Sequence, residues 1–142
     1  MSKTSRRIFL SYHVDDKEPV RRIADCLRES GFPVWDPERE ILPGAEWTST
    51  LKKALDSALA VVVFVSPEAL KSSSVSREIE YALGARHLRG RLIPVILRPA
   101  KNAPWILQSL QPIRYEDPSQ TSARIVELLS QPFNASQAKR SA

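Results

Sequence analysis

Cysteine, glycine and long apolar runs are scarce in this chain, and each scarcity excludes a class of protein. Cys26 is the only cysteine, so an internal disulfide is impossible and a thiolate zinc site is disfavoured. The four glycines, at 31, 44, 84 and 90, fit neither a phosphate-binding loop nor a dinucleotide fingerprint. No apolar run approaches the ~20 residues that span a bilayer, and the N-terminus lacks a secretory signal. We therefore expect a cytoplasmic protein that does not contact the membrane.

A net charge of +5 raises the question of nucleic acid binding, but the basic residues are interleaved with 16 acids. No zinc finger, aromatic RNA-binding signature or basic zipper is present, so nucleic acid is not an expected partner. Either a solvated face or a contact with phosphates or another copy of the chain would explain the densest basic group. This group comprises Arg86, Arg89, Arg91, Arg98 and Lys101.

Short apolar runs alternate with longer amphipathic ones, which is typical of strands and helices around a parallel sheet. The 142 residues suit a single domain, for which we predict residues 6–131, with an N-terminal arm at 1–5 and a disordered tail at 132–142. Strands are predicted at 8–12, 32–35, 59–65, 92–97 and 113–115. The run at 59–65 is unbroken, as expected of a strand buried on both faces. Pro94 is unexpected inside a strand with two neighbours.

Helices are predicted between these strands from caps and apolar spacing. The first begins at Asp16, as its cap, and ends at Gly31, where a left-handed residue is expected. Another begins near Trp47, a brief turn is capped by Ser66, and a longer helix begins near Ser74. The last surrounds residues 125–129. A flavodoxin-like three-layer α/β fold follows, with a five-stranded parallel sheet in the order 2-1-3-4-5, helices on both faces, and a ligand site at the carboxyl ends of the strands.

Two glutamates lie in the segment "VSREIEYAL" at 75–83, and helical geometry separates them. At about 100° per residue, Val75, Ile79, Ala82 and Leu83 form a buried stripe. Glu78 lies on the shoulder of this stripe, toward the edge where strands end, whereas Glu80 points into water. Position near the helix N-terminus favours an ionised Glu78 by ~0.3–1 kcal/mol. From the spacing alone, Glu78 is either a ligand-facing acid or a surface glutamate beside Arg77.

Several segments, taken in order, resemble the Toll/interleukin-1 receptor (TIR) domain of the bacterial type. "RRIFLSY" is similar to its first-strand box, and "GFPVWDPEREILPGAEW" to its second strand and BB loop with the proline-glycine pair. "AVVVFVSPEAL" followed by "REIEYAL" resembles its third strand and the next helix, and "RLIPVIL" its fourth strand. The resemblance covers roughly residues 6–130 and implies the flavodoxin-like sheet already predicted.

The resemblance implies one of two functions. TIR enzymes cleave NAD+ between nicotinamide and ribose, giving ADP-ribose or a cyclic isomer, and their catalytic glutamate is at the position of Glu78. Nicotinamide leaves as a neutral molecule, so one carboxylate suffices to stabilise the cation that forms. Other TIR domains are non-catalytic modules that bind TIR domains. We expect the NAD+ nucleosidase, acting in bacterial immune signalling or as a toxin-like effector, with NAD+ as substrate, no cofactor or metal, and self-association.

Further substrate-binding residues are carried over from the resemblance. Tyr12 and His13 follow the first strand, and His13 is either a base or an ordinary loop histidine. Trp35 and Trp47 flank the BB loop, where each either stacks on a flat ring or packs in the core. The remaining candidates are Ser11, Asp36, Ser66 and Ser74.

Two of these positions depart from the family pattern. Ser74 stands where many members have tryptophan or cysteine, and Asp36 lies one place before the usual acid, where this chain has Pro37. A receiver domain of the same fold is excluded because Ser66 replaces its phosphoacceptor aspartate and no lysine lies near Tyr115.

Overall fold

The computed structural model describes residues 6–41, 44, 46–101 and 103–130. The predicted arm at 1–5, the tail at 132–142 and Pro43 of the proline-glycine pair lie outside these residues. The strands are β1 (Ile8–Ser11), β2 (Val34–Trp35), β3 (Ala60–Val65), β4 (Leu92–Ile96) and β5 (Ile113–Arg114). The helices are η2 (Val14–Asp16), α1 (Lys17–Glu29), α2 (Pro37–Glu40), α3 (Trp47–Asp56), α4 (Pro67–Leu70), α5 (Ser73–Gly84), η3 (Arg86–Leu88), α6 (Trp105–Ser109) and α7 (Pro118–Ser130).

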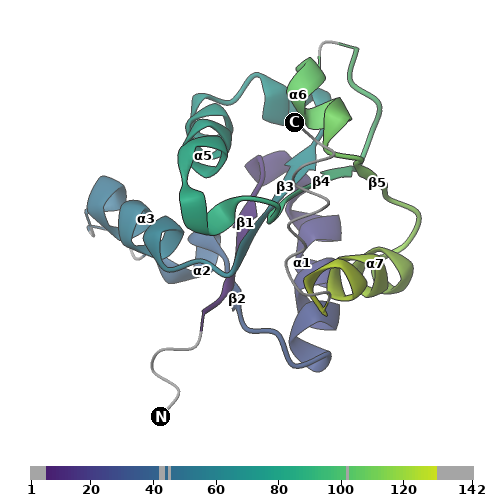
Figure 1. Ribbon diagram of the computed structural model, residues 1–142, viewed down its shortest axis with the longest axis horizontal. Coiled ribbons are helices and arrows are strands. Elements are labelled where there is room, and N and C mark those ends of the chain that lie inside the picture. Colours follow the sequence, from purple (N-terminus) through teal and green to yellow (C-terminus); the bar gives the residue numbers. More distant parts are fainter. Residues whose placement is uncertain (1–5, 42–43, 45, 102, 131–142) are drawn as a thin grey trace.

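All strand pairs are parallel, and the sheet order β2-β1-β3-β4-β5 confirms the prediction. Helices α3, α5 and α6 cover one face of the sheet, and α1 and α7 cover the other (Figure 1). Every residue of β3 is buried, as the unbroken apolar run predicts for a central strand. Because the five strands are parallel, their carboxyl ends all lie along the same edge of the sheet.

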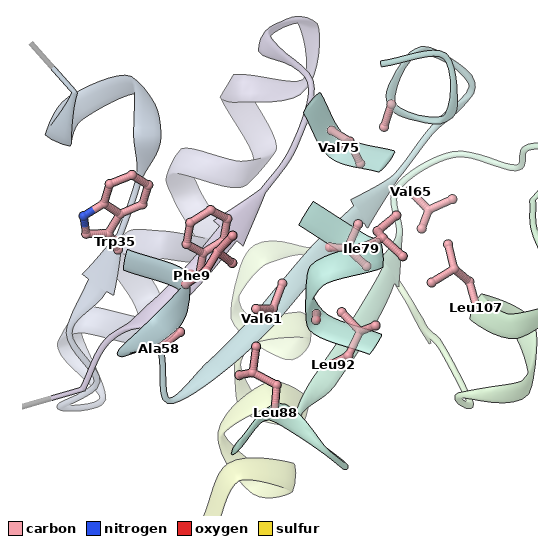
Figure 2. Packing of buried hydrophobic residues seen from close by; sticks show 14 residues of the cluster. Phe9, Trp35, Ala58, Val61, Val65, Val75, Ile79, Leu88, Leu92 and Leu107 are labelled. Atoms are coloured by element: carbon pink, nitrogen blue, oxygen red, sulfur yellow. The ribbon is translucent and has the colours of Figure 1, made fainter. Parts of the chain in front are cut away.

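Side chains on successive strand residues alternate between two cores. Phe9, Val61 and Val63 face α3, α5 and α6, where Figure 2 shows Phe9 beside Trp35. The neighbouring residues of the same strands face α1 and α7. This alternation decides which candidate site residues share a face.

Pro94 costs the sheet no hydrogen bond because of where β5 begins. The N–H of Leu97 donates to the carbonyl of Val65 in β3 at 2.9 Å. Because N–H groups alternate in direction along a strand, the nitrogen of Pro94 faces the side of β5. The first paired residue of β5 is Ile113, which lies opposite Val95, one residue beyond Pro94. The missing donor therefore falls before the ladder starts.

The predicted helix boundaries agree well, with three differences. One is α6 (Trp105–Ser109), which lies between β4 and β5 where a loop containing Pro99, Pro104 and Trp105 is predicted. Gly31 has a φ of +94° directly after α1, as expected of a left-handed C-cap. Asp16 stands at the N-cap of α1, as predicted, but its side chain makes no capping hydrogen bond. The segment after β2 is predicted as a loop, but it contains α2. Asp36 caps this helix by accepting a hydrogen bond from the N–H of Glu38.

Candidate functional site

Glu78 occupies the buried side of α5. The helix begins after Ser72, whose hydroxyl accepts a hydrogen bond from the N–H of Val75. Glu78 is only 3% exposed, and Glu80 is exposed, so the predicted separation of the two acids is confirmed. Leu83, placed in the buried stripe by the same reasoning, is 46% exposed, and that prediction is wrong. The buried face of α5 is therefore centred nearer to Glu78 than an ideal helical wheel starting at Val75 predicts.

Two serine hydroxyls hold the Glu78 carboxylate. Ser11, the last residue of β1, donates to Oε1 at 2.6 Å, and Ser74, one turn earlier in α5, donates to Oε2 at 3.0 Å. Ser11 is two residues after Phe9 and so points to the face that α5 covers. The contact joins the carboxyl end of β1 to α5, between residues 67 positions apart.

Burial raises the pKa of Glu78, and the hydrogen bonds from Ser11 and Ser74 partly oppose this increase. No basic side chain contacts the carboxylate within the part of the chain that the structure describes. The sequence predicts that the helix N-terminus favours the ionised form of Glu78, but this effect does not set the direction of the pKa shift. Glu78 is the sixth residue of α5, whereas the dipole effect fades beyond the first turn.

We expect Glu78→Gln to stabilise the protein at neutral pH, by about 1 kcal/mol in the free energy of unfolding. The folded state raises the pKa of Glu78, so its contribution to stability is fully present below the unfolded pKa and is lost as pH rises through the folded pKa. Glutamine keeps the shape without the buried charge. Urea denaturation at pH 7.5 should show the increase, and at pH 4 the two proteins should be nearly equal. A less stable variant at pH 7.5 would contradict this interpretation.

Tyr12 and Asp36 form a second pair, separate from Glu78. The Tyr12 hydroxyl donates to Oδ1 of Asp36 at 2.6 Å, and Asp36 is buried. Burial and the neighbouring Asp36 raise the pKa of Tyr12 well above its usual value. Tyr12 packs edge-on against Phe64, in the core that α1 and α7 cover, and therefore points away from Ser11. The pair joins the end of β1 to the start of α2.

Ser66 belongs to a third cluster, which joins three loops at the carboxyl ends of the strands. Its hydroxyl donates to Oδ2 of Asp16 at 2.5 Å and accepts a hydrogen bond from the N–H of Ala69. Arg98, after β4, bonds Asp16 at 2.7 Å and Glu68 at 2.6 Å. Sequence reasoning assigned Asp16 to capping and missed this network. The one available signal was that these polar residues lie in the segments that follow β1, β3 and β4.

No hydrogen bond joins His13, Trp35 or Trp47 to Glu78 in the described part of the chain. The Nδ1 of His13 accepts a hydrogen bond from the N–H of Asp15, which is the loop alternative. Trp35 is buried and stacks on Phe9 with ring centroids 5.1 Å apart, which is the core alternative. Trp47 is 47% exposed at the start of α3, so the core alternative is wrong for it.

Of the nine predicted site residues, the structure joins Glu78, Ser11 and Ser74 in one hydrogen-bonded cluster, and Tyr12 and Asp36 in a separate pair. The substrate contacts predicted for these residues, and the catalytic role of Glu78, stay predictions. A hollow of about 560 Å³ lies between β5 and α7, and none of the predicted site residues lines it. We place the candidate site at Glu78 because it is a buried carboxylate with a raised pKa and no counter-ion among the described residues, and such groups cluster at functional sites.

The basic residues that cluster in the sequence do not form one patch. Arg91 precedes β4 and Arg98 follows it, so the five residues of this strand, roughly 16 Å long, separate them. Arg98 is engaged by Asp16 and Glu68. Within the described ranges, no group of three or more metal-binding side chains could hold an ion, and no helix has the length and apolarity needed to cross a bilayer.

Comparison with known proteins supports one family throughout. The model of the TIR domain matches residues 8–129. A curated protein of Bacteroides thetaiotaomicron, the 2′ cyclic ADP-D-ribose synthase BtTIR, is 30% identical over 86 residues. This stretch is 60% of the present chain and 30% of that protein, so the likeness spans less than a third of the relative's length.

Two solved structures share the fold. The TIR domain of the Toll-related receptor TRR-2 from Hydra magnipapillata superposes with a TM-score of 0.74 at 16% identity, covering 87% of this chain and 98% of that one. A metazoan TIR-STING receptor from C. gigas superposes with a TM-score of 0.71 at 27% identity, covering 89% of this chain and 41% of the receptor.

Proposed function

The chain belongs to the TIR domain family, and we propose that it cleaves NAD+ between nicotinamide and ribose, with Glu78 as the catalytic residue. The observation that carries the proposal is the buried carboxylate of Glu78, which two neutral hydroxyls hold and no cation neutralises among the described residues. The similarity to a cyclic ADP-ribose synthase supports the same chemistry. We assign the activity to bacterial immune signalling, as the family resemblance implies.

An unpaired buried anion suits this reaction because positive charge develops on the substrate. As the bond from ribose C1′ to the pyridinium nitrogen breaks, its electron pair leaves with nicotinamide, which becomes neutral. The ribose becomes an oxocarbenium-like cation. A carboxylate fixed beside it stabilises that charge most strongly where water is excluded. No general acid is required because the leaving group needs no proton.

The fate of the ribosyl cation decides the product. Attack of water on C1′, with loss of a proton to solvent, gives ADP-ribose. Attack by a nucleophile of the same molecule gives a cyclic isomer and releases a proton likewise. The reaction needs no redox cofactor, because no oxidation state changes in either route. Glu78 orients the ribose by accepting hydrogen bonds from its hydroxyls, for which an ionised carboxylate has about four acceptor positions.

Incubation with NAD+ followed by mass spectrometry tests the proposal directly. We expect free nicotinamide together with ADP-ribose or a cyclic isomer. The assay should be run over a range of protein concentrations, because the proposal includes self-association through TIR–TIR contacts. A folded protein that releases no nicotinamide at any concentration would refute the proposed activity.

A non-catalytic TIR module, which assembles with its own kind or with another TIR domain, is the second candidate. The exposed tryptophans favour it. Trp105 at the start of α6 is 76% exposed, and Trp47 is 47% exposed. Large exposed aromatic side chains are typical of protein interfaces. This function would be supported instead if the protein leaves NAD+ intact and forms an oligomer, measured by sedimentation, that Trp105→Ala disrupts.

A further inference from the structure

Glu78 is held by groups from two different elements, and neither of them carries a charge. The hydroxyl of Ser11 comes from the carboxyl end of β1, and that of Ser74 comes from the first turn of α5. Each binds a different carboxylate oxygen. Because Ser11 is fully buried and Glu78 is 3% exposed, this arrangement is fixed by the packing of α5 on the sheet.

We propose that Ser11 and Ser74 are positioning residues, an inference that rests on the proposed function. They fix the Glu78 carboxylate so that each of its oxygens can also accept a hydrogen bond from one ribose hydroxyl. A carboxylate oxygen has two acceptor positions. The serines take one on each oxygen, and the two that are left are suited in number to the vicinal 2′ and 3′ hydroxyls of the nicotinamide ribose.

The serines also determine when Glu78 is charged. Burial disfavours the ionised form, and among the described residues these two donors are the groups that favour it. Arg77 and Glu80, the nearest charged residues along α5, are exposed, and no charged group of the described part of β1, β3 or α5 contributes to the pKa of Glu78. Removing either hydroxyl should therefore raise the pKa of Glu78 further, so that the carboxylate is protonated at higher pH.

The experiment compares Ser11→Ala, Ser74→Ala and Ser74→Thr with wild type. Ser76→Ala is the matched control, since Ser76 is an exposed serine of the same helix. The titration of Glu78 is followed by carbon-13 NMR of labelled carboxyl groups, with the signal assigned by its absence in Glu78→Gln. Nicotinamide release is measured over the same pH range.

We expect both alanine variants to raise the pKa of Glu78, with the larger effect at Ser11, whose bond to the carboxylate is shorter. The acidic limb of the rate should move to higher pH, with the rate on that limb about tenfold lower. Threonine at 74 keeps a hydroxyl and should restore the wild-type titration. Ser76→Ala should titrate as wild type.

An unchanged Glu78 titration in both alanine variants would overturn the inference, as would an equal shift in Ser76→Ala. If Ser11→Ala does not fold, the comparison of Ser74→Ala with Ser74→Thr decides the outcome. Ser74 is only half-buried, so both of these variants should fold. The failure of the proposed function is distinguishable: the titration would shift as expected, but the wild-type protein would release no nicotinamide.

Discussion

Glu78→Gln is expected to lower the rate of nicotinamide release by on the order of 10²–10³-fold or more, the usual loss when one preorganised electrostatic contact to a transition state is removed. Glutamine retains the shape of the side chain and can still accept from Ser11. It lacks the negative charge that the ribosyl cation requires. The loss should therefore appear in kcat more than in KM.

Glu80→Gln is the matched control for this result. Glu80 lies two residues further along α5, carries the same carboxyl group and is exposed. Its replacement should leave the rate within about twofold of wild type, because an exposed carboxylate is screened by solvent. Equal losses at the two positions, or no loss at either, would contradict the assignment of Glu78.

Trp35→Ala should cost about 3–5 kcal/mol in the free energy of unfolding, as expected when a large buried aromatic side chain is removed. The ring of Trp35 is buried and stacks on Phe9 at the junction of β1 and β2. Trp47→Ala should cost less than about 1 kcal/mol, because half of that side chain is already in water. Urea denaturation followed by circular dichroism measures both.

The comparison of the two tryptophans also has a kinetic readout. If Trp47 stacks on the substrate, Trp47→Ala should raise KM for NAD+ while the protein remains as stable as wild type. A small loss of stability in Trp35→Ala would show that its ring does not contribute to the core, and the stacking role predicted for it would regain support.

The local sequence pattern was sufficient to predict the position of an element, or the burial of a residue, where this depends on which face of the element is apolar. The unbroken apolar run of β3 fixed the centre of the sheet, and the 100° rotation per residue distinguished Glu78 from Glu80. The start of α2 was also within reach, because Asp36 followed by proline is a helix N-terminus signal. The prolines around it favour a loop instead, so the local signals conflict at this position.

The contacts of the site could not be predicted, because they join residues far apart in the sequence. Ser11 and Glu78 are 67 positions apart, and Asp16 meets Ser66 and Arg98 across 50 and 82 positions. Periodicity places a side chain on a face but does not say which polar atom it meets there. For this reason the sequence predicts Asp16 only as a helix cap and does not predict the pairing of Tyr12 with Asp36.

A crystal structure of Glu78→Gln with NAD+ bound tests the central claim most directly, because the variant should hold the substrate without cleaving it. We expect the hydroxyls of the nicotinamide ribose within hydrogen-bonding distance of the residue 78 side chain, with Ser11 and Ser74 still on its other side. A nucleotide bound elsewhere, with residue 78 remote from any ribose in every copy of the assembly, would contradict the account.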